Sequence, residues 1–246
     1  MVRGSYISDG TLQKIDALKT RIEGYKGQKA IRLHNQRRAV LESESLNTSL
    51  YIEYPDLAHV ARGHRDRETR KLLKRLETAW GYCIGAFQED NEITKRDLEI
   101  IQGILVPEGE VGVRQGNVEI NYPGSHNPPP GGNLVQNLLS TLLQEQKGRA
   151  KNLHPVEAAA YIHLHLLYIH PFEDGNGRTS RLIQNCMLSR SGYAPAIIEA
   201  HERGLYFALL PQAINGMLVD DTMEQRPFFE FIASKVYKGL ERVLQG

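Results

Sequence analysis

Cysteine is scarce in this chain, and that scarcity bears on where the protein works. Only Cys83 and Cys186 occur among 246 residues, and they are far apart, without the spacing of a CxxC motif. Neither a secretory signal pattern nor an apolar run of about eighteen residues occurs. We therefore expect a protein of the reducing cytoplasm that has no membrane as a partner.

An excess of charge of one sign is also lacking. Lys and Arg total 30, and Asp and Glu total 29, which leaves a net charge of +1. A balanced chain offers no global attraction to nucleic acid or to an anionic membrane, so we expect neither as a partner. The P-loop pattern GxxxxGK(S/T) does not occur either, so that motif provides no competing phosphate site.

Amphipathic patterns indicate that most of the chain is helical. With 41% apolar residues, 246 residues can bury one sizeable core, and we expect one domain. Helical patterns cover residues 12–25, 30–53, 68–88, 95–104, 134–145, 155–169, 178–190 and 227–244. The exception is 107–133, which is rich in Gly and Pro and in which Val118-Glu-Ile-Asn alternates as a strand does. The predicted fold class is all-α with one small β-hairpin.

The most informative stretch is His170-Pro-Phe-Glu-Asp-Gly-Asn-Gly-Arg-Thr-Ser-Arg181. The residues before it, 155–169, are almost continuously apolar, which predicts a helix that is buried on most of its circumference. Pro171 lacks a backbone donor and disfavours the α conformation at His170, so this helix should end there. We expect the His170 imidazole to face a cleft rather than the core.

A phosphate site is predicted where the next helix begins, just after Gly175-Asn176-Gly177. A helix amino end offers unpaired N–H groups and a partial positive charge, and glycine lets the backbone approach an anion closely. Arg178 and Arg181 are three residues apart, so both can lie on one face over the same phosphates. Asp174 stands just before the glycines, where a hard oxygen ligand for Mg²⁺ is needed. Together these features indicate a nucleoside triphosphate site.

This stretch resembles the signature of the Fic family, His-Pro-Phe-x-(Asp/Glu)-Gly-Asn-Gly-Arg-x-x-Arg, and every specified position is present. The resemblance covers roughly the whole chain, for example at Gly112-Val-Arg114 before the signature and at Pro227-Phe-Phe-Glu-Phe231 after it. It implies a mostly helical Fic fold with a small β-hairpin flap at about 112–130. It also implies an N-terminal helical region over 1–94 and a catalytic core over 95–246, with the signature at 170–181.

The resemblance implies an enzyme, a protein adenylyltransferase that transfers AMP from ATP to a Ser, Thr or Tyr hydroxyl of a protein substrate. His170 is then the general base, and Asp174 holds Mg²⁺ on the phosphates. The nucleotide-binding residues implied are Asp174, Gly175, Asn176, Gly177, Arg178, Thr179, Ser180, Arg181, Tyr206 and Asn215. The flap residues implied to bind the target are Tyr122, Pro123, Gly124, Ser125 and His126.

An amino-terminal segment points to self-inhibition. Ser49-Leu-Tyr-Ile-Glu53 resembles the inhibitory-helix motif of the family, (Ser/Thr)-x-x-x-Glu-(Gly/Asn), and we expect this helix at about 38–53. In the family, the glutamate pairs with the second arginine of the signature, here Arg181, and takes the space of the γ-phosphate. Tyr54 stands where the motif has Gly or Asn. Some relatives with this glutamate also remove AMP, so deAMPylation is open as a further activity.

Other functions remain open on the sequence. One is a catalytically silent module that binds nucleotide or peptide, against which the intact His170, Asp174 and Arg181 argue. Another is transfer of a different nucleotide such as UMP, although the Asp-Gly-Asn triplet favours AMP because kinase-like and phosphocholine-transferring relatives have Asp-Ala-Asn. His163 and His165 are expected to be structural, since their spacing from His170 does not place the three on one helix face. A homodimer is open as well.

Overall fold

The computed structural model describes residues 5–24, 67–86, 92–120, 125–148 and 152–245. The helices are α1 (Asp9–Glu23), α3 (Arg67–Ala86), α4 (Lys95–Leu105), α5 (Asn133–Lys147), α6 (Pro155–Ile169), α7 (Asn176–Arg190), the 3-10 helix η3 (Ala200–Glu202), α8 (Arg203–Leu218) and α9 (Thr222–Gln245). These ranges contain no strand, and no helix in them is long and apolar enough to cross a membrane. The prediction of a mostly helical fold is confirmed.

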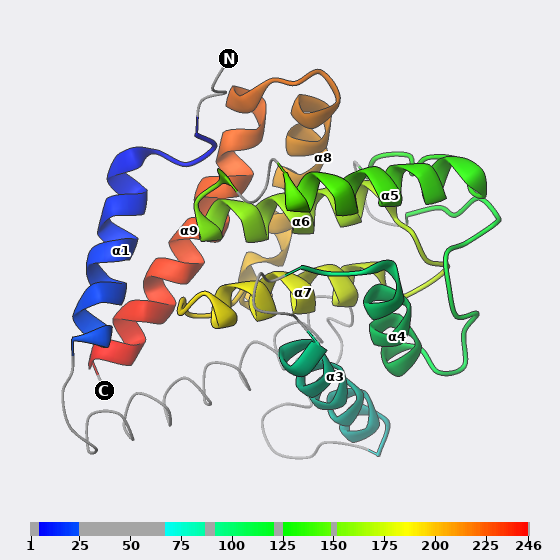
Figure 1. Cartoon of the computed structure of the whole chain (residues 1–246), viewed down its shortest axis with the longest axis horizontal. Helices are drawn as coiled ribbons and strands as arrows, with labels where there is room; N and C mark the ends of the chain where they lie inside the picture. The colour runs from blue at the N-terminus through cyan, green and yellow to red at the C-terminus, as the bar shows by residue number, and fades with distance from the viewer. Residues whose placement is uncertain (1–4, 25–66, 87–91, 121–124, 149–151, 246) are drawn as a thin grey trace.

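Helix α6 lies at the centre of the fold, as its sequence predicts. Its side chains are buried around the circumference, among them those of Ala159, Ala160, Ile162 and Leu164. Helices α5, α7, α8 and α9 all pack against it (Figure 1). A helix that is apolar all round is stable only when neighbours cover every side, which is why α6 becomes the core. Its central position fixes where the turn at its carboxyl end can lie.

Helix α1 packs along α9 at one side of the fold (Figure 1). Ser8 caps it by accepting a hydrogen bond from the amide of Thr11. The segment before it is held by the buried Glu157 of α6, whose Oε1 accepts from the Ser5 hydroxyl at 2.6 Å and from the Ile7 amide at 2.9 Å. The described part of the amino-terminal region therefore shares its hydrophobic core with the rest of the chain.

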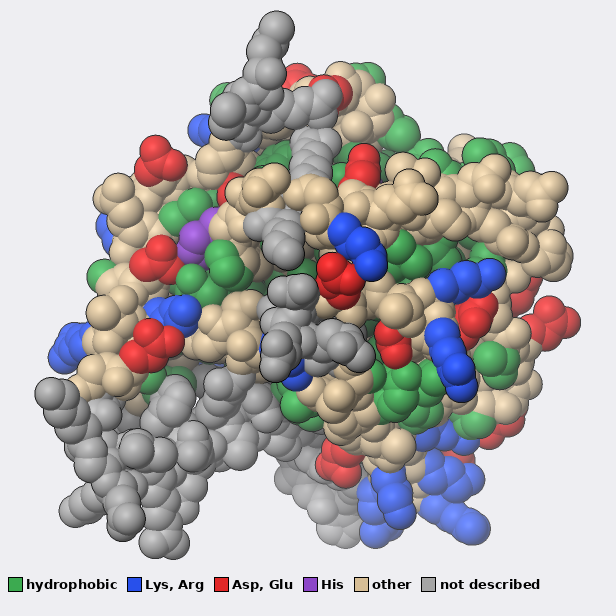
Figure 2. Space-filling model, in the orientation of Figure 1, with side chains coloured by type: hydrophobic (Ala, Val, Ile, Leu, Met, Phe, Trp, Pro, Cys, Tyr) green, Lys and Arg blue, Asp and Glu red, His purple; other side chains and the backbone are tan. Residues whose placement is uncertain are grey.

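Helices α3 and α4 pack against each other and against α7. Thr94 caps α4, and Asp97 completes the capping box by accepting from the Thr94 amide at 2.9 Å. Buried Leu73 and Leu76 mark the inward side of α3. Its basic residues lie on the exposed side, and Figure 2 shows Lys and Arg side chains gathered over this helix. Helix α3 is thus apolar toward the core and cationic toward solvent.

Some helix bounds differ from the predicted ones. The last helix was predicted to begin at Pro227, but it begins at Thr222 and contains this proline. A proline near a helix start removes one of the early intrahelical hydrogen bonds and is tolerated better than one in the middle. Helix α7 begins at Asn176 rather than at Arg178, because Gly175 is its N-cap. The helix predicted over 30–53 lies outside the described residues.

The chain between α4 and α5, residues 106–132, is called the flap loop below. Residues 118–120 form no strand, and 121–124 lie outside the described part of the chain, so the predicted β-hairpin is not confirmed. Pro128-Pro-Pro130 lacks backbone donors, which disfavours strand pairing on the far side of the expected turn. The described part of this loop is irregular.

Candidate active site

Helix α6 ends at Ile169, and its C-cap His170 has a left-handed backbone conformation with φ 49° and ψ 60°. Pro171 follows, and a residue before proline avoids the right-handed α region, so the predicted helix end is confirmed. The imidazole Nδ1 lies 3.3 Å from the carbonyl oxygen of Leu167. A carbonyl can only accept, so in the neutral ring Nδ1 carries the proton and Nε2 is the basic nitrogen.

The turn between α6 and α7 is held by the side chain of Asn176. Its Oδ1 accepts from the Phe172 amide at 2.9 Å, and its Nδ2 donates to the Phe172 carbonyl at 2.8 Å. Both residues are buried, where an unmade hydrogen bond is costly. The resemblance implied that Asn176 binds nucleotide; its side chain fixes the turn, which leaves its backbone amide for that role.

Gly175 is the N-cap of α7, and this position requires glycine for two reasons. Its φ is 85°, in the left-handed region that side chains disfavour. A Cβ atom here would also meet Val106 Cγ2 at 2.8 Å. Gly175, Asn176 and Gly177 line a cavity at the start of the helix. The first N–H groups of a helix have no intrahelical partner, so this wall suits an anion.

Asp174 and Arg178 form an ion pair across the same turn, with Asp174 Oδ2 3.0 Å from Arg178 Nη2. The Asp174 side chain is 62% exposed, whereas that of Arg178 is 4% exposed. Arg178 Nη1 also donates to the carbonyl of Leu105, the last residue of α4, at 3.3 Å. The guanidinium thus joins α7 to α4. The structure brings Asp174 to the cavity wall but does not bring Arg178 there.

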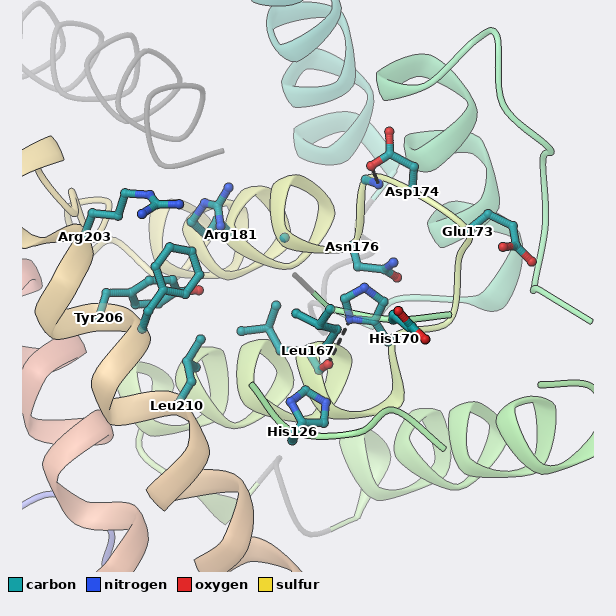
Figure 3. A pocket seen from close by; sticks show the side chains of 15 residues that line it. His126, Leu167, His170, Glu173, Asp174, Asn176, Arg181, Arg203, Tyr206 and Leu210 are labelled. Carbon is teal, nitrogen blue, oxygen red and sulfur yellow. Dashed lines mark hydrogen bonds between the residues drawn. The ribbon is translucent and has the colours of Figure 1, made fainter. Parts of the chain in front are cut away.

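His170 and the α6–α7 turn border a cavity of about 400 Å³, shown from close by in Figure 3. Its walls come from the flap loop, the end of α6, the α6–α7 turn, α7 and α8. It is lined by Glu119, Ile120, His126, Leu167, His170, Glu173, Asp174, Gly175, Asn176, Gly177, Arg181, Arg203, Tyr206, Phe207 and Leu210. The volume lies within the range of about 300 to 1,000 Å³ that small-molecule sites occupy.

Charge within the cavity is divided between two ends. Figure 3 shows Arg181 and Arg203 toward Tyr206, whereas Glu173 and Asp174 lie beyond His170 on the other side. Arg181 comes from α7 and is 4% exposed. A negatively charged ligand is drawn to the arginine end, because like charge repels it from the carboxylates. The imidazole lies between these two regions.

Arg203 is a site residue that sequence reasoning missed. It lies on α8 together with Tyr206, Phe207 and Leu210, and the spacing i, i+3, i+4 and i+7 places all four on one helix face. Its guanidinium carbon is 4.7 Å from the centroid of the Phe207 ring. The sequence does carry this signal, because a cation three residues before an expected pocket residue shares its face.

The hydroxyl of Tyr206 is bonded to the core. Its Oη lies 2.9 Å from Nε2 of His163, which is completely buried. His163 Nδ1 contacts the Gln184 side-chain oxygen, which can only accept, so Nε2 accepts from the tyrosine hydroxyl. Burial lowers the pKa of His163 to about 3, so the ring is neutral. Tyr206 therefore offers its ring to a ligand, and His163 has the structural role that was predicted.

Besides Arg178, three of the nucleotide-binding residues implied by the resemblance do not line the cavity. Asn215 is exposed and follows Tyr206 by about two and a half turns of α8, which places it on the opposite helix face. Thr179 and Ser180 are buried within α7. The Ser180 hydroxyl donates to the Gly177 carbonyl at 3.0 Å, so it is engaged within its own helix.

The flap loop contributes His126 to the cavity wall. Its Nε2 donates to the carbonyl of Tyr168 at 3.2 Å, and burial lowers its pKa. The neighbouring Ser125 hydroxyl donates to the carbonyl of Ile120 at 2.7 Å. The His126 contact holds the loop beside the end of α6, and the Ser125 contact lies within the loop. Four other predicted residues lie outside the described part of the chain: Glu53, Tyr122, Pro123 and Gly124.

A second cavity of about 350 Å³ lies along the flap loop. It is lined by Asn117, Val118, Glu119, Ile120, Ser125, His126, Asn127, Pro128 and Pro130. Glu119, Ile120 and His126 also line the first cavity, so these three residues form a wall that the two cavities share.

Comparison with known sequences is consistent with this site. Residues 92–188 match the model of the Fic/DOC family. The protein adenylyltransferase Fic of Drosophila persimilis is 37% identical over 173 residues, which make up 69% of this chain and 32% of the relative. The chain belongs to the Fic/DOC family. It spans about a third of the length of the curated relatives it matches.

Solved structures share the fold. A Fic domain containing signaling protein from Bacteroides thetaiotaomicron has a TM-score of 0.76 at 19% identity, and the match covers 95% of each chain. Fic-1 from C. elegans has a TM-score of 0.72 at 19% identity, with 95% of this chain and 71% of that chain covered. At these identities the likeness establishes the fold, and the predicted helical Fic fold is confirmed.

Proposed function

We propose that this protein transfers AMP from ATP to a hydroxyl group of a protein substrate. The observation that carries the proposal is a single cavity lined by His170, the amino end of α7 and Arg181. A base, an anion-binding helix end and a cation are the groups that transfer from a nucleoside triphosphate needs. The name of the Drosophila persimilis relative supports the same activity.

The proposed reaction uses Nε2 of His170 as the general base. Nε2 takes the proton of the substrate hydroxyl, whose oxygen attacks the α-phosphorus of ATP. The bond from that phosphorus to the oxygen that bridges to the β-phosphate breaks, and pyrophosphate leaves. The hydrogen bond from Nδ1 to Leu167 orients the ring for this step. The amides of Asn176 and Gly177 stabilise the charge on the α-phosphate, and Arg181 binds the terminal phosphates.

The nucleoside part of ATP would occupy the side of the cavity formed by α8. Tyr206, Phe207 and Leu210 line it there with apolar surface, and the Tyr206 hydroxyl is engaged with His163. An aromatic ring binds a base through its face and needs no hydrogen bond to do so. This arrangement supports binding of a nucleotide but discriminates weakly between bases, which keeps UMP transfer as an outcome of the test.

Asp174 is the residue that would hold Mg²⁺ on the phosphates. Its carboxylate lines the cavity and is 62% exposed, so its oxygen atoms are accessible to an ion. The described residues contain no group of three or more potential metal ligands. That fits Mg²⁺, which commonly uses one or two carboxylates together with phosphates and water. When bound, the ion supplies positive charge that neutralises the phosphates.

The protein substrate would bind along the flap loop, in the second cavity. The wall shared by the two cavities supports this proposal, because a segment in the second cavity would lie next to the cavity that contains His170. Recognition through backbone groups of an extended segment depends little on sequence, so one flap can accept several targets.

Self-inhibition by Glu53 is proposed from the sequence resemblance. In this proposal the carboxylate pairs with Arg181 and excludes the γ-phosphate, and the same carboxylate also serves removal of AMP from a modified target. A buried guanidinium with one carboxylate partner is difficult to share with a phosphate, because both compete for the same donors. Glu53→Gly is therefore the variant in which transfer is measured.

The test follows label from α-labelled and γ-labelled ATP, UTP and GTP in the Glu53→Gly protein. We expect protein labelling from α-labelled ATP that disappears in Glu53→Gly with His170→Ala. Labelling from the γ-position alone would contradict AMP transfer, and labelling from UTP in preference to ATP would indicate UMP transfer. Calorimetry that detects binding of magnesium-ATP without any labelling would identify a silent binding module.

A further inference from the structure

Arg114 is a buried arginine of the flap loop for which the proposed reaction has no direct use. It is 2% exposed, and its guanidinium donates to main-chain carbonyls. Burial lowers the pKa of Arg114, whereas the charge of nearby Glu173 raises it. A buried cation is stable only when its donors are used, so the partners of this guanidinium indicate its role.

The guanidinium of Arg114 binds main-chain carbonyls on two segments. On the α6 side, Nε donates to His170 O at 2.7 Å and Nη2 to Ile169 O at 3.4 Å. On the flap loop, Nη1 donates to Gly116 O at 2.7 Å and Nη2 to Pro129 O at 2.5 Å. One side chain thus joins the end of the central helix to both parts of the flap loop.

The backbone of Arg114 extends this connection. Its amide donates to Pro171 O at 2.9 Å, and its carbonyl accepts from the Gly132 amide at 3.2 Å. With the side-chain bonds, the carbonyls of Ile169, His170 and Pro171 all accept hydrogen bonds from this one residue. The last carbonyls of a helix lack intrahelical partners and carry partial negative charge, so a cation is well suited to this position.

The conformation of His170 shows why this connection matters. A left-handed backbone at a residue other than glycine persists only when its surroundings determine it, and the φ of His170 is 49°. The bond from Arg114 Nε to His170 O holds the carbonyl of that same residue. The planar fork of arginine can reach several carbonyls at once, which a lysine cannot do.

We propose that Arg114 is a positioning residue that holds His170, and with it the imidazole, in the orientation for proton transfer, and that couples this orientation to the flap loop. The inference deepens the proposed function and rests on it for its effect on the reaction. If Arg114 served stability alone, its loss would lower the melting temperature without a specific effect on turnover.

The experiment compares Arg114→Gln and Arg114→Lys with Glu157→Gln, all in the Glu53→Gly background. Glu157 is a matched control, because it is a buried polar residue at the other end of α6 that bonds Ser5 and Ile7. We expect Arg114→Gln to lower kcat for AMP transfer by about 10-fold to 100-fold, the size of effect that a small misplacement of a catalytic group produces. The Kd for magnesium-ATP should change much less.

The control and the lysine variant sharpen the result. Glu157→Gln should lower the melting temperature and leave kcat unchanged, measured well below the unfolding transition. Arg114→Lys retains the charge at the end of α6, so it should fold and recover part of the kcat lost in Arg114→Gln. An unchanged kcat in folded Arg114→Lys and Arg114→Gln would overturn the inference. Equal losses of kcat and of ATP affinity would overturn it too, because they indicate collapse of the whole site.

A second measurement does not depend on activity. Hydrogen–deuterium exchange should become faster in peptides covering 166–176 and 125–132 in the Arg114 variants, and should stay unchanged there in Glu157→Gln. If the Glu53→Gly protein itself transfers no AMP, the proposed function fails, and the exchange data still decide whether Arg114 holds His170. Unchanged exchange in both peptides would refute the positioning role.

Discussion

The two connecting segments that border the cavity, the α6–α7 turn and the flap loop, are fixed by different means. The α6–α7 turn contains its own determinants, since Gly175 supplies a left-handed φ and Asn176 bonds back to Phe172. The flap loop is anchored instead by Arg114, which bonds carbonyls at the end of α6. A turn of a few residues can be specified by a short motif. A long loop needs partners that lie elsewhere in the fold.

The largest expected difference between the two segments is between their histidines. His170→Ala should lower AMP transfer by about 10²-fold to 10⁴-fold, because it removes the proton acceptor. His126→Ala should cause a much smaller loss, since this ring anchors the flap loop by donating to the Tyr168 carbonyl of α6. Steady-state kcat in the Glu53→Gly background measures both, with melting curves to verify folding. Equal losses would mean that the flap loop takes part in the chemistry.

The next largest difference between the two segments is expected for glycine substitutions, which should affect ATP binding in the α6–α7 turn more than in the flap loop. Gly175→Ala combines a φ of 85° with a Cβ contact of 2.8 Å to Val106, so it should destabilise the fold by about 1–3 kcal/mol and weaken ATP binding. In Gly131→Ala the Cβ would meet the carbonyl oxygen atoms of Gly116 and Gln115 in the flap loop. That variant should also lose stability but should bind ATP more nearly as the parent does.

Denaturant unfolding and calorimetry measure these two effects. The control is Gly81→Ala in α3, where an added Cβ has no atom within 4 Å. It should stabilise the protein by about 0.5–1 kcal/mol, because alanine favours a helix interior more than glycine. If Gly131→Ala weakened ATP binding as much as Gly175→Ala, the proposed phosphate site at the start of α7 would lose its support.

Acid should distinguish the helical core from the flap loop. An unfolded histidine has a pKa of about 6.5, and the folded pKa of His163 is about 3. As the pH falls below about 6.5, the unfolded chain binds a proton that the folded one does not. The free energy of unfolding therefore falls toward pH 3, by up to about 1.4 kcal/mol per pH unit. Burial lowers the pKa of His126 as well, so its contribution has the same sign.

Unfolding at pH 7, 5 and 4 tests this dependence. His163→Gln should flatten the decline more than His126→Gln, because His163 is completely buried and bonded on both ring nitrogens. The difference in the free energy of unfolding between wild type and His163→Gln should therefore change with pH. If it were the same at every pH, the folded state would not keep this ring neutral.

The smallest effect is expected for the hydroxyl of Tyr206. Tyr206→Phe should lower the free energy of unfolding by about 1 kcal/mol, since it removes the bond to His163. The Kd for ATP should change little, because the ring remains in the cavity wall. Tyr206→Leu should weaken ATP binding more, as loss of a stacking ring costs about 1–3 kcal/mol. If Tyr206→Phe weakened ATP binding as much as Tyr206→Leu, the hydroxyl would contact the nucleotide.

Much of the fold and of the α6–α7 turn could be predicted because their determinants are local. The apolar run 155–169 predicts a buried helix, Pro171 predicts where it ends, and the glycines predict a tight approach at the next helix. Each of these depends on residues within one or two helical turns. Such signals are readable in a single sequence.

The other features of the site could not be predicted, because they depend on contacts between distant parts of the chain that sequence spacing does not encode. Arg178 and Arg181 are equally able to face the phosphates by spacing, and the position of the α4 carboxyl end decides that Arg178 turns toward Leu105. The partners of Arg114 are main-chain carbonyls, which every residue has, so no pattern of side chains in the sequence predicts them. Asn215 was assigned by resemblance, and the helical repeat of α8 carries it to the opposite face.

The wall formed by Glu119, Ile120 and His126 has a thermodynamic consequence. If occupancy of one cavity shifts these side chains, the affinity of the other changes, and by linkage the two affinities change by the same factor. If a polypeptide held along the flap loop strengthened nucleotide binding, the nucleotide would strengthen polypeptide binding by the same factor, and a weakening would be shared in the same way. The three side chains of the shared wall would then make binding of the nucleotide and binding of the protein substrate depend on each other.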